Sequence, residues 1–350
     1  STPIKSSAAS DVYKRQEKSL QTYLSPDYQW NTYKWTLSLS VPLRWTGYTG
    51  VGFSRISVNP SLSIIYKLNY AWRFTVHASY KERYGEMTDL YDRPYQTDYR
   101  NSVWNCGILP VYRQQLYSVY GEYKNTAREF FATVNLTHNR EWYNRIYEQR
   151  IENGQIQRVS LPLSNHGSGY TVKSTLSKGF YDLGLKTSLL ALLNISKAEQ
   201  ISGGQRLPYQ YRLMRLEPKV IWTPNRHWET SYQTDIRYGG SKIGERTRLA
   251  PLWNVTQQVQ LSYIFSPIEA SLSVDHYHND VNEDQSVNAV FADFSVLWKS
   301  RRWQITATAT NLFDKRTYAY TRYASLESYT SWVHILSLIH ISEPTRQAEI

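Results

Sequence analysis

The residues best suited to hold a ligand lie between positions 86 and 107, in the stretch EMTDLYDRPYQTDYRNSVWNCG. Aromatic side chains alternate there with charged side chains of both signs. Aromatic faces combined with hydrogen-bonding groups are suited to gripping a sugar or a peptide. The same composition also suits a loop whose side chains only pack on one another, so both interpretations stay open. The candidate ligand-binding residues are Tyr91, Tyr95, Tyr99, Arg100 and Trp104.

Metal and catalytic chemistry find little support in the sequence. His276 and His278 are two residues apart and close to Asp275 and Asp280, which is a weak indication of a metal site. On a strand both imidazoles lie on the same side as Val274, where interfacial packing is the simpler role. The chain has no GxSxG, GxxxxGK[ST], HExxH or Rossmann glycine motif, and its single cysteine supports neither a disulfide framework nor a cysteine-based zinc site. We therefore expect no metal, no cofactor and no enzymatic activity.

The composition excludes a helical membrane protein. The 350 residues include 30 Tyr and 12 Trp, yet the mean hydropathy is −0.56. No run of about 18 apolar residues occurs. Strands of a membrane β-barrel alternate apolar and polar residues, so a hydropathy averaged over a window of residues does not detect them. The net charge of +11 and the many aromatic residues would also suit single-stranded nucleic acid. However, the basic residues are mixed with acidic ones and form no block, so we expect no nucleic-acid partner.

The strongest pattern is an alternation of apolar and polar residues. In YKWTLSLSVPLRW, which begins at Tyr33, every odd position is apolar or aromatic and no even position is a large hydrophobe. Because strand side chains point alternately to opposite faces, this pattern predicts a strand with one apolar and one polar face. Aromatic residues at both ends with aliphatic residues between them are typical of a membrane strand. The same alternation begins at Trp72, Phe130, Ile268 and Trp303.

The lengths of the connections favour a membrane barrel over a sandwich. We predict about fourteen strands, at 33–48, 56–68, 72–85, 111–124, 128–150, 169–180, 185–198, 209–222, 228–238, 254–264, 268–278, 287–299, 302–312 and 327–335. Short connections are expected at 69–71, 125–127, 181–184, 223–227, 265–267 and 300–301, and long ones at 85–110, 151–168, 199–208, 239–253, 279–286 and 313–326. Short periplasmic turns that alternate with long extracellular loops are typical of outer-membrane barrels. A Greek-key sandwich has no reason to keep that order. No convincing helix is expected.

The residue pattern at both ends of the chain differs from that of the rest of the sequence. SSAASDVYKRQ at 6–16 and LSLIHISEPTR at 336–346 each match, residue for residue, the translation of a transposon-based sequencing adapter. We therefore expect residues 1–16 and 336–350 to be adapter-derived and residues 17–335 to be the protein sequence, cut at both ends. The alternative is a flexible N-terminal tail and a short C-terminal strand.

Three stretches carry a resemblance to a known family. WQITATATNLFDKRTY (Trp303–Tyr318) resembles the penultimate strand and following loop of TonB-dependent outer-membrane receptors, where an Asn-Leu-Phe-Asp/Asn step is typical. The stretches Pro60–Gly85 and Met87–Asn101 look like a hairpin and a loop of Bacteroidetes members of that family. The resemblance implies an all-β fold, an antiparallel transmembrane β-barrel that is incomplete here, because the family barrel has about 22 strands around an N-terminal plug.

The resemblance also implies a location and partners. The location is the cell outer membrane. The partners are outer-membrane lipid, a scarce nutrient ligand (siderophore, glycan or peptide), the TonB system acting through the missing plug, and a surface lipoprotein. Two alternatives stay open: a porin-like barrel without TonB coupling, and a soluble aromatic-rich β-sandwich that binds carbohydrate. An incomplete barrel leaves two unpaired edges, which are unfavourable in lipid and prone to aggregation. We therefore expect the chain to fold poorly alone.

Overall fold

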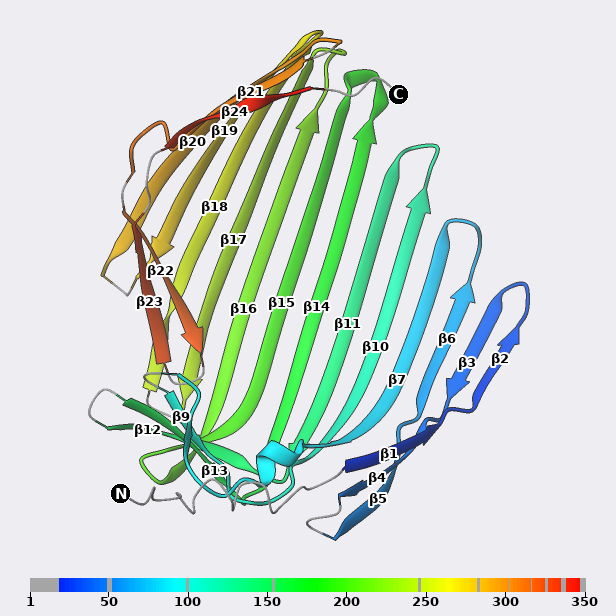
Figure 1. The fold of residues 1–350 in the computed structure, drawn as a ribbon. Helices are drawn as coiled ribbons and strands as arrows, with labels where there is room; N and C mark the ends of the chain where they lie inside the picture. Colours follow the sequence, from blue (N-terminus) through cyan, green and yellow to red (C-terminus); the bar gives the residue numbers. More distant parts are fainter. Residues whose placement is uncertain are drawn as a thin grey trace.

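The chain folds into one broad, curved antiparallel sheet with smaller elements gathered at one end of its strands (Figure 1). The structure is a computed structural model. It describes residues 19–48, 52–98, 101–152, 155–244, 247–281, 284–301, 303–315, 317–324, 327–334 and 338–346. Within these ranges the strands form a 19-stranded sheet, a three-stranded sheet and a two-stranded hairpin.

Four of the 19 strands of the large sheet gather at one end; the other fifteen run side by side in one continuous series. In spatial order they are β2 (Asp27–Asn31), β3 (Trp35–Ser40), β6 (Ser61–Lys67), β7 (Trp72–Tyr84), β10 (Val111–Asn125), β11 (Phe130–Tyr143), β14 (Asn165–Phe180), β15 (Leu185–Ser202), β16 (Gln205–Trp222), β17 (Trp228–Ile243), β18 (Thr247–Phe265), β19 (Ile268–Asp280), β20 (Ser286–Lys299), β21 (Trp303–Thr310) and β24 (Leu338–Arg346). In the described residues β2 and β24 do not pair with each other, so the sheet is open. The prediction of an all-β, antiparallel and incomplete barrel is confirmed.

The alternation of the sequence gives this sheet two different faces. Val119 lies opposite Leu136, and the row continues through Val172, Leu193 and Met214 on successive strands. Directly paired residues share a face, so these residues form one continuous apolar row. All five are more than a third exposed. We call their side of the sheet the apolar face and the opposite side, to which the residues between them point, the polar face.

In the described residues, the connections at one end of the main strands are tight turns. Figure 1 shows them along the upper rim, for example between β14 and β15, where the one-turn 3-10 helix η3 (Tyr181–Leu183) closes the connection. Gly184 ends that turn with φ +59°, and a Cβ there would lie 2.1 Å from the carbonyl oxygen of Thr223. The position therefore requires glycine for two reasons: the positive φ angle and the lack of room for a Cβ atom.

The opposite end carries the more elaborate connections. The 3-10 helix η2 (Met87–Leu90), β8 (Tyr95–Gln96), β9 (Asn101–Trp104), β12 (Ile146–Glu152) and β13 (Gln155–Leu161) gather there, and we call this group the cap. β13 runs parallel to β9, and Glu148 of β12 makes one parallel pair with Ile201 of β15. Ile146 and Val159 are 1% and 5% exposed, so the cap has a packed interior of its own.

Two further groups lie beside the main sheet. β1 (Ser19–Leu24), β4 (Leu43–Tyr48) and β5 (Phe53–Val58) form the three-stranded sheet near the cap end. β22 (Thr317–Ala324) and β23 (Glu327–His334) form the separate hairpin. The predicted strand at 327–335 is thus observed as β23, but it pairs with β22 and not with the main sheet. β24, from the segment expected to be adapter-derived, pairs with β21 instead.

Several predicted boundaries are wrong. The single strand predicted at 33–48 is broken at Pro42, which has no N–H for a ladder: β3 pairs with β6, whereas β4 pairs with β5. The strand at 56–68 is broken in the same way at Pro60. The strand at 128–150 is interrupted at Asn144, whose amide accepts a hydrogen bond from Val111 N at 2.8 Å and donates one to Leu109 O at 2.9 Å.

Most of the long connections were predicted too long. Residues 199–208 are almost entirely strand, because β15 and β16 meet in a two-residue turn at Gly203 and Gly204, both with positive φ. Residues 239–253 are likewise mostly β17 and β18. The loops predicted at 85–110, 151–168 and 313–326 contain the strands β8, β9, β13 and β22. The short connections are all found, so the difference between the two ends of the sheet holds for only part of the chain.

Candidate ligand-binding site

A hydrogen-bonded cluster on the polar face lies next to the cap and is centred on Glu141 of β11. Tyr112, Gln114 and Asn139 donate to Glu141 Oε1 at 3.2, 3.1 and 3.0 Å, and Tyr143 donates to Oε2 at 3.2 Å. The strand geometry explains the grouping. Asn139 and Tyr143 are two residues from Glu141 on the same strand, and Gln114 is directly opposite on β10.

The two tyrosines of this cluster stay protonated over a wide pH range. Their rings are 4.8 Å apart between centroids. Burial raises the pKa of Tyr112 to about 12, and the carboxylate of Glu141 adds to the effect. Burial and the same carboxylate raise the pKa of Tyr143 as well. Both hydroxyls are therefore fixed as donors to Glu141, and the two rings form a rigid wall.

Two cations lie beside this wall. The guanidinium of Arg83 is 5.4 Å from the centre of the Tyr112 ring, within range of a cation–π interaction. Lys81 lies opposite Gln114 and is exposed. Within the described part of the chain, neither cation forms a salt bridge to a carboxylate. The surface can therefore accept a ligand that has rings or hydroxyls together with negative charge.

An ion pair ties the cap to this end of the sheet. Arg145 Nη1 is 2.9 Å from Asp89 Oδ1, and the two side chains are only 14% and 21% exposed. The guanidinium carbons of Arg145 and Arg158 lie 5.0 and 3.7 Å from the centre of the Tyr147 ring. Burial raises the pKa of Tyr147 even though both arginines lower it. These contacts join η2, β12 and β13 into one packed unit.

The structure brings together only some of the residues predicted to bind ligand. Tyr91 and Tyr95 form an edge-to-face pair with centroids 6.2 Å apart, and they are 53% and 38% exposed. Trp104 is also 38% exposed and donates its Nε1–H to Asp92 Oδ1 at 3.3 Å. Tyr99 and Arg100 lie outside the described residues. The three described residues are on the outside of the cap, where their exposed rings can contact a ligand.

The Glu141 cluster was not predicted from the sequence. Its signal is the spacing Asn139-x-Glu141-x-Tyr143, with polar and aromatic side chains on one face of a strand. That spacing becomes informative only once the register with Tyr112 and Gln114 is known, because the cluster needs both strands.

The described residues contain neither a metal-binding cluster nor a helical membrane span. In the described residues no group of three or more His, Cys, Asp or Glu is arranged to hold a metal ion. His278 instead contacts Asn288 Oδ1 at 2.8 Å through Nδ1, and its Nε2 is 3.5 Å from Asp280 Oδ1. No helix in the part of the chain that the structure describes is long and apolar enough to cross a membrane.

Comparisons with known proteins give a likeness at the level of the fold only. No family model matches the chain, and no curated protein matches its sequence. Among solved structures it is similar to the siderophore receptor PirA from Acinetobacter baumannii, with a TM-score of 0.42, 7% identity and 85% of this chain covered. It is also similar to BauA, the ferric preacinetobactin receptor of the same species, with a TM-score of 0.49, 8% identity and 91% covered. The chain spans 60% of PirA and 56% of BauA. At these values we draw no functional conclusion from the likeness.

Proposed function

We propose that the chain is the barrel part of an outer-membrane receptor for TonB-coupled uptake of a scarce nutrient. The observation that carries the proposal is a pair of aromatic contacts at two levels of one hairpin. Trp228 on β17 lies opposite Tyr263 on β18, and Tyr238 lies opposite Trp253 further along the same strands. Ring centroids are 4.6 Å apart in both pairs, and all four residues belong to the apolar face.

The separation of the two levels fits a bilayer. At about 3.3 Å per residue, the ten-residue step from Trp228 to Tyr238 covers roughly 33 Å along the strand. A strand tilt of about 40° reduces this to roughly 25 Å along the membrane normal, the height of the apolar band on outer-membrane barrels. A soluble sandwich does not expose an apolar band bounded by two aromatic levels.

The polar face supports the same proposal. Arg215 on β16 lies directly opposite Arg237 on β17, and Asp235 bridges them, with N–O distances of 2.9 and 2.6 Å. Such a network is costly against lipid but favourable in a water-filled or plug-filled lumen. We therefore assign the apolar face to lipid and the polar face to the lumen.

This assignment gives the two ends of the strands different roles. The tight-turn end faces the periplasm and the cap faces the outside, where it meets the nutrient. Exposed rings on the cap make the first contact, and the wall around Glu141 with Arg83 and Lys81 continues the site into the lumen. The cations favour an anionic ligand of the siderophore, glycan or peptide classes. A plug, the TonB system and a surface lipoprotein are the further partners that the sequence resemblance implies.

We further propose that only residues 17–335 belong to the natural protein and form a partial barrel. Pairing at a sheet edge uses backbone groups that every residue carries, so an unrelated extended segment can add to it. The position of β24 is therefore compatible with an adapter origin of residues 336–350. Sequencing of the source DNA across codons 17 and 335 tests this. Uninterrupted genomic sequence coding for DVYKRQ and LSLIHI would refute it, whereas a plug coding region upstream would support TonB coupling over a porin-like channel.

The membrane assignment is tested by refolding the chain with and without lipid. In phosphatidylcholine vesicles we expect the chain to co-float with lipid and to resist extraction by carbonate, because lipid covers the apolar face, although the two unpaired edges lower the fraction of chain that inserts. In buffer alone we expect aggregation, because the apolar face and both sheet edges stay uncovered. A chain that folds in buffer and does not bind to vesicles would instead support the soluble carbohydrate-binding sandwich.

A further inference from the structure

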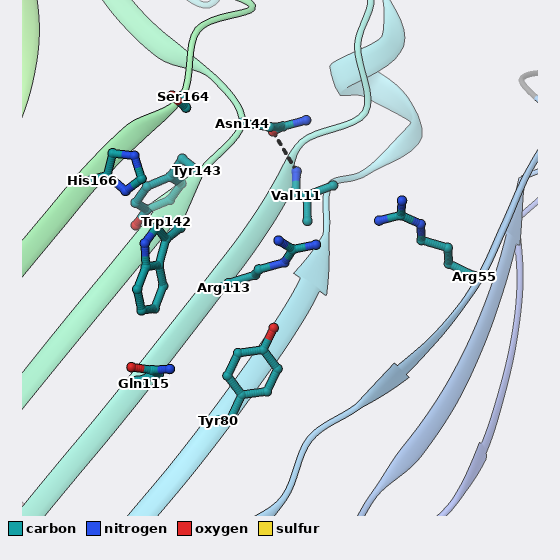
Figure 2. A pocket seen from close by; sticks show the side chains of 10 residues that line it. All are labelled: Arg55, Tyr80, Val111, Arg113, Gln115, Trp142, Tyr143, Asn144, Ser164 and His166. Atoms are coloured by element: carbon teal, nitrogen blue, oxygen red, sulfur yellow. Dashed lines mark hydrogen bonds between the residues drawn. The ribbon is translucent and has the colours of Figure 1, made fainter.

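A cavity of about 590 Å³ lies close to the cap, and most of its lining side chains on the main strands belong to the apolar face, although Tyr143 of the Glu141 cluster also lines it. Figure 2 shows its lining, with Arg113 on β10 and Arg55 on β5 extending toward one another across the opening. Trp142 of β11 and His166 of β14 line the cavity from the side. The ten lining residues include two arginines and one histidine but no carboxylate.

The cavity lies just beyond the apolar band. Tyr117, His138 and Tyr170 form a row across β10, β11 and β14, with ring centroids 6.4 and 4.2 Å apart. Arg113 and Trp142 are four residues further along the same strands, toward the cap. Four residues correspond to roughly 13 Å along a strand and roughly 10 Å along the normal of a tilted strand. This is the depth of lipid headgroups next to the hydrocarbon core.

The arginines are held in place and still have free donors. Arg113 Nε donates to Glu82 Oε2 at 2.8 Å. Glu82 also accepts from Tyr80 at 3.2 Å and from Tyr84 at 2.5 Å. Burial opposes ionisation of Glu82, but these hydrogen bonds outweigh it and lower its pKa, so the carboxylate stays charged and fixes Arg113. In the described residues Arg55 forms no salt bridge, and only Nε of Arg113 is engaged.

Arg140, between the aromatic row and Trp142, strengthens the positive character of this surface. It is exposed, and its Nε donates to His138 Nε2 at 3.2 Å, which leaves its terminal amino groups free in the described surroundings. Guanidinium groups suit phosphate because their planar donors match two phosphate oxygens at once. The indole of Trp142 adds an apolar surface with a polar edge, as is common where lipid meets water.

We propose that this cavity binds the phosphate-bearing sugar headgroup of a glycolipid in the outer leaflet. The inference rests on the proposed membrane location, because only that location places headgroups at this depth. Charge complementarity and depth select this occupant. The lining offers two guanidinium groups and no carboxylate, and the cavity opens immediately above the row at which acyl chains end. The glycolipid would contact mainly the outer wall of the barrel, whereas Arg83 and Lys81 of the nutrient site lie on the polar face.

The experiment uses the full chain in phosphatidylcholine vesicles that contain either bisphosphorylated lipid A or the same lipid without its phosphates. After transfer to detergent, native mass spectrometry measures how much lipid A stays bound across a titration. The test variant is R55Q/H166Q. The matched control is R128Q, because Arg128 is exposed in the tight turn at the other end of β10 and β11. R140Q is a second test variant should the double variant not insert.

We expect wild type and R128Q to retain bisphosphorylated lipid A with similar apparent Kd. R55Q/H166Q should weaken that binding about tenfold or more, and R140Q should weaken it in the same direction. Equal binding by all variants, or equal binding of lipid A without phosphates, overturns the inference. Competition by inorganic phosphate as strong as by the lipid also overturns it, because the site would then be a simple anion site. If neither the wild type nor any variant enters plain phosphatidylcholine vesicles, the membrane proposal itself is refuted. This outcome differs from a loss of lipid A binding by inserted protein, so the two failures can be told apart.

Discussion

Leu189 of β15 lies directly opposite Leu176 of β14, and both leucines are exposed on the apolar face, at 36% and 41%. They are near the middle of the apolar stretch of β15, between Leu185 and Ile195. Ser188, the residue before Leu189, points to the polar face and is exposed there. Two adjacent residues at the same depth thus meet opposite environments if the sheet spans a bilayer.

This pair gives a direct test of the membrane assignment. We expect L189R to destabilise the inserted chain by about 2–4 kcal/mol, the cost of an arginine against lipid near the midplane. S188R should change stability by less than about 1 kcal/mol, because its side chain enters the lumen. Urea unfolding in phosphatidylcholine vesicles, followed by tryptophan fluorescence, measures both. Equal effects of the two variants would show that lipid does not cover the apolar face.

The Glu141 cluster leads to a prediction about pH. In E141Q the pKa of Tyr112 should fall from about 12 but stay above its usual value of 10, because burial, its main cause, remains. Ultraviolet difference titration at 295 nm should show tyrosinate forming at lower pH than in wild type. E229Q is the control, since Glu229 is exposed at the tight-turn end. Unchanged titration in E141Q would mean that Glu141 does not act on the two tyrosines.

The same shift has a consequence for stability. A phenol whose pKa is higher in the folded state stabilises that state fully below the unfolded pKa, about 10, and loses the contribution as pH rises through the folded value. We therefore expect the wild-type chain to lose stability between pH 10 and 12. E141Q should lose less over this interval. Stability that rises across the interval would contradict the assignment.

The sequence was sufficient to predict the centre of the sheet but not its edges and ends. The strand predicted at 72–85 is β7, at Trp72–Tyr84, and the strand predicted at 268–278 ends only two residues before β19 does. Both alternate without interruption, so pattern and fold agree. The strand predicted at 33–48 alternates equally well, yet Pro42 breaks it. Alternation describes side-chain faces, whereas a ladder also needs backbone N–H groups.

The prediction at β17 and β18 is wrong in the opposite direction. A long connection was predicted at 239–253, but β17 continues to Ile243. The register shifts between Gly239 and Ser241, opposite Pro251, so a bulge accommodates the missing N–H. A bulge depends on the partner strand and could not be inferred from either strand alone. The Glu141 cluster was missed for the same reason, since its donors come from two strands.

The ion pair between Asp89 and Arg145 predicts how the cap is held. In D89N the charge is lost, although the amide oxygen can still accept the bond from Glu86 N, which is 2.9 Å long in the wild type. We expect the cap to lose about 1–3 kcal/mol of local stability, because Arg145 is then left largely buried without a counter-charge. Hydrogen exchange of peptides covering 86–98 should accelerate. D182N, in an exposed turn at the other end, should leave that exchange unchanged; equal protection in D89N would mean that the pair is not formed.

The predicted aromatic residues and the Glu141 wall make a joint prediction about ligand binding. A ferric tris-catecholate complex, a neutral maltooligosaccharide and a pentapeptide serve as probes of the three nutrient classes, with quenching of tryptophan fluorescence as the readout. We expect the anionic catecholate complex to bind most tightly, because Arg83 and Lys81 have no carboxylate partner in the described residues. R83Q should weaken that binding about tenfold, the loss of one charge-assisted contact. Tightest binding of a neutral probe, unaffected by R83Q, would exclude the wall as an anion-binding surface.

The contribution of the cap is separated with a second pair of variants. Y91A/Y95A removes the exposed edge-to-face pair. The double variant should slow association or weaken affinity several-fold. The effect is modest because each exposed ring adds contact area but few buried hydrogen bonds. Y181A, which removes a ring that is 88% exposed in a tight turn, is the control and should leave the affinity unchanged. If R83Q weakens binding and Y91A/Y95A does not, the ligand is held by the lumen wall alone, and the cap aromatics pack only on one another.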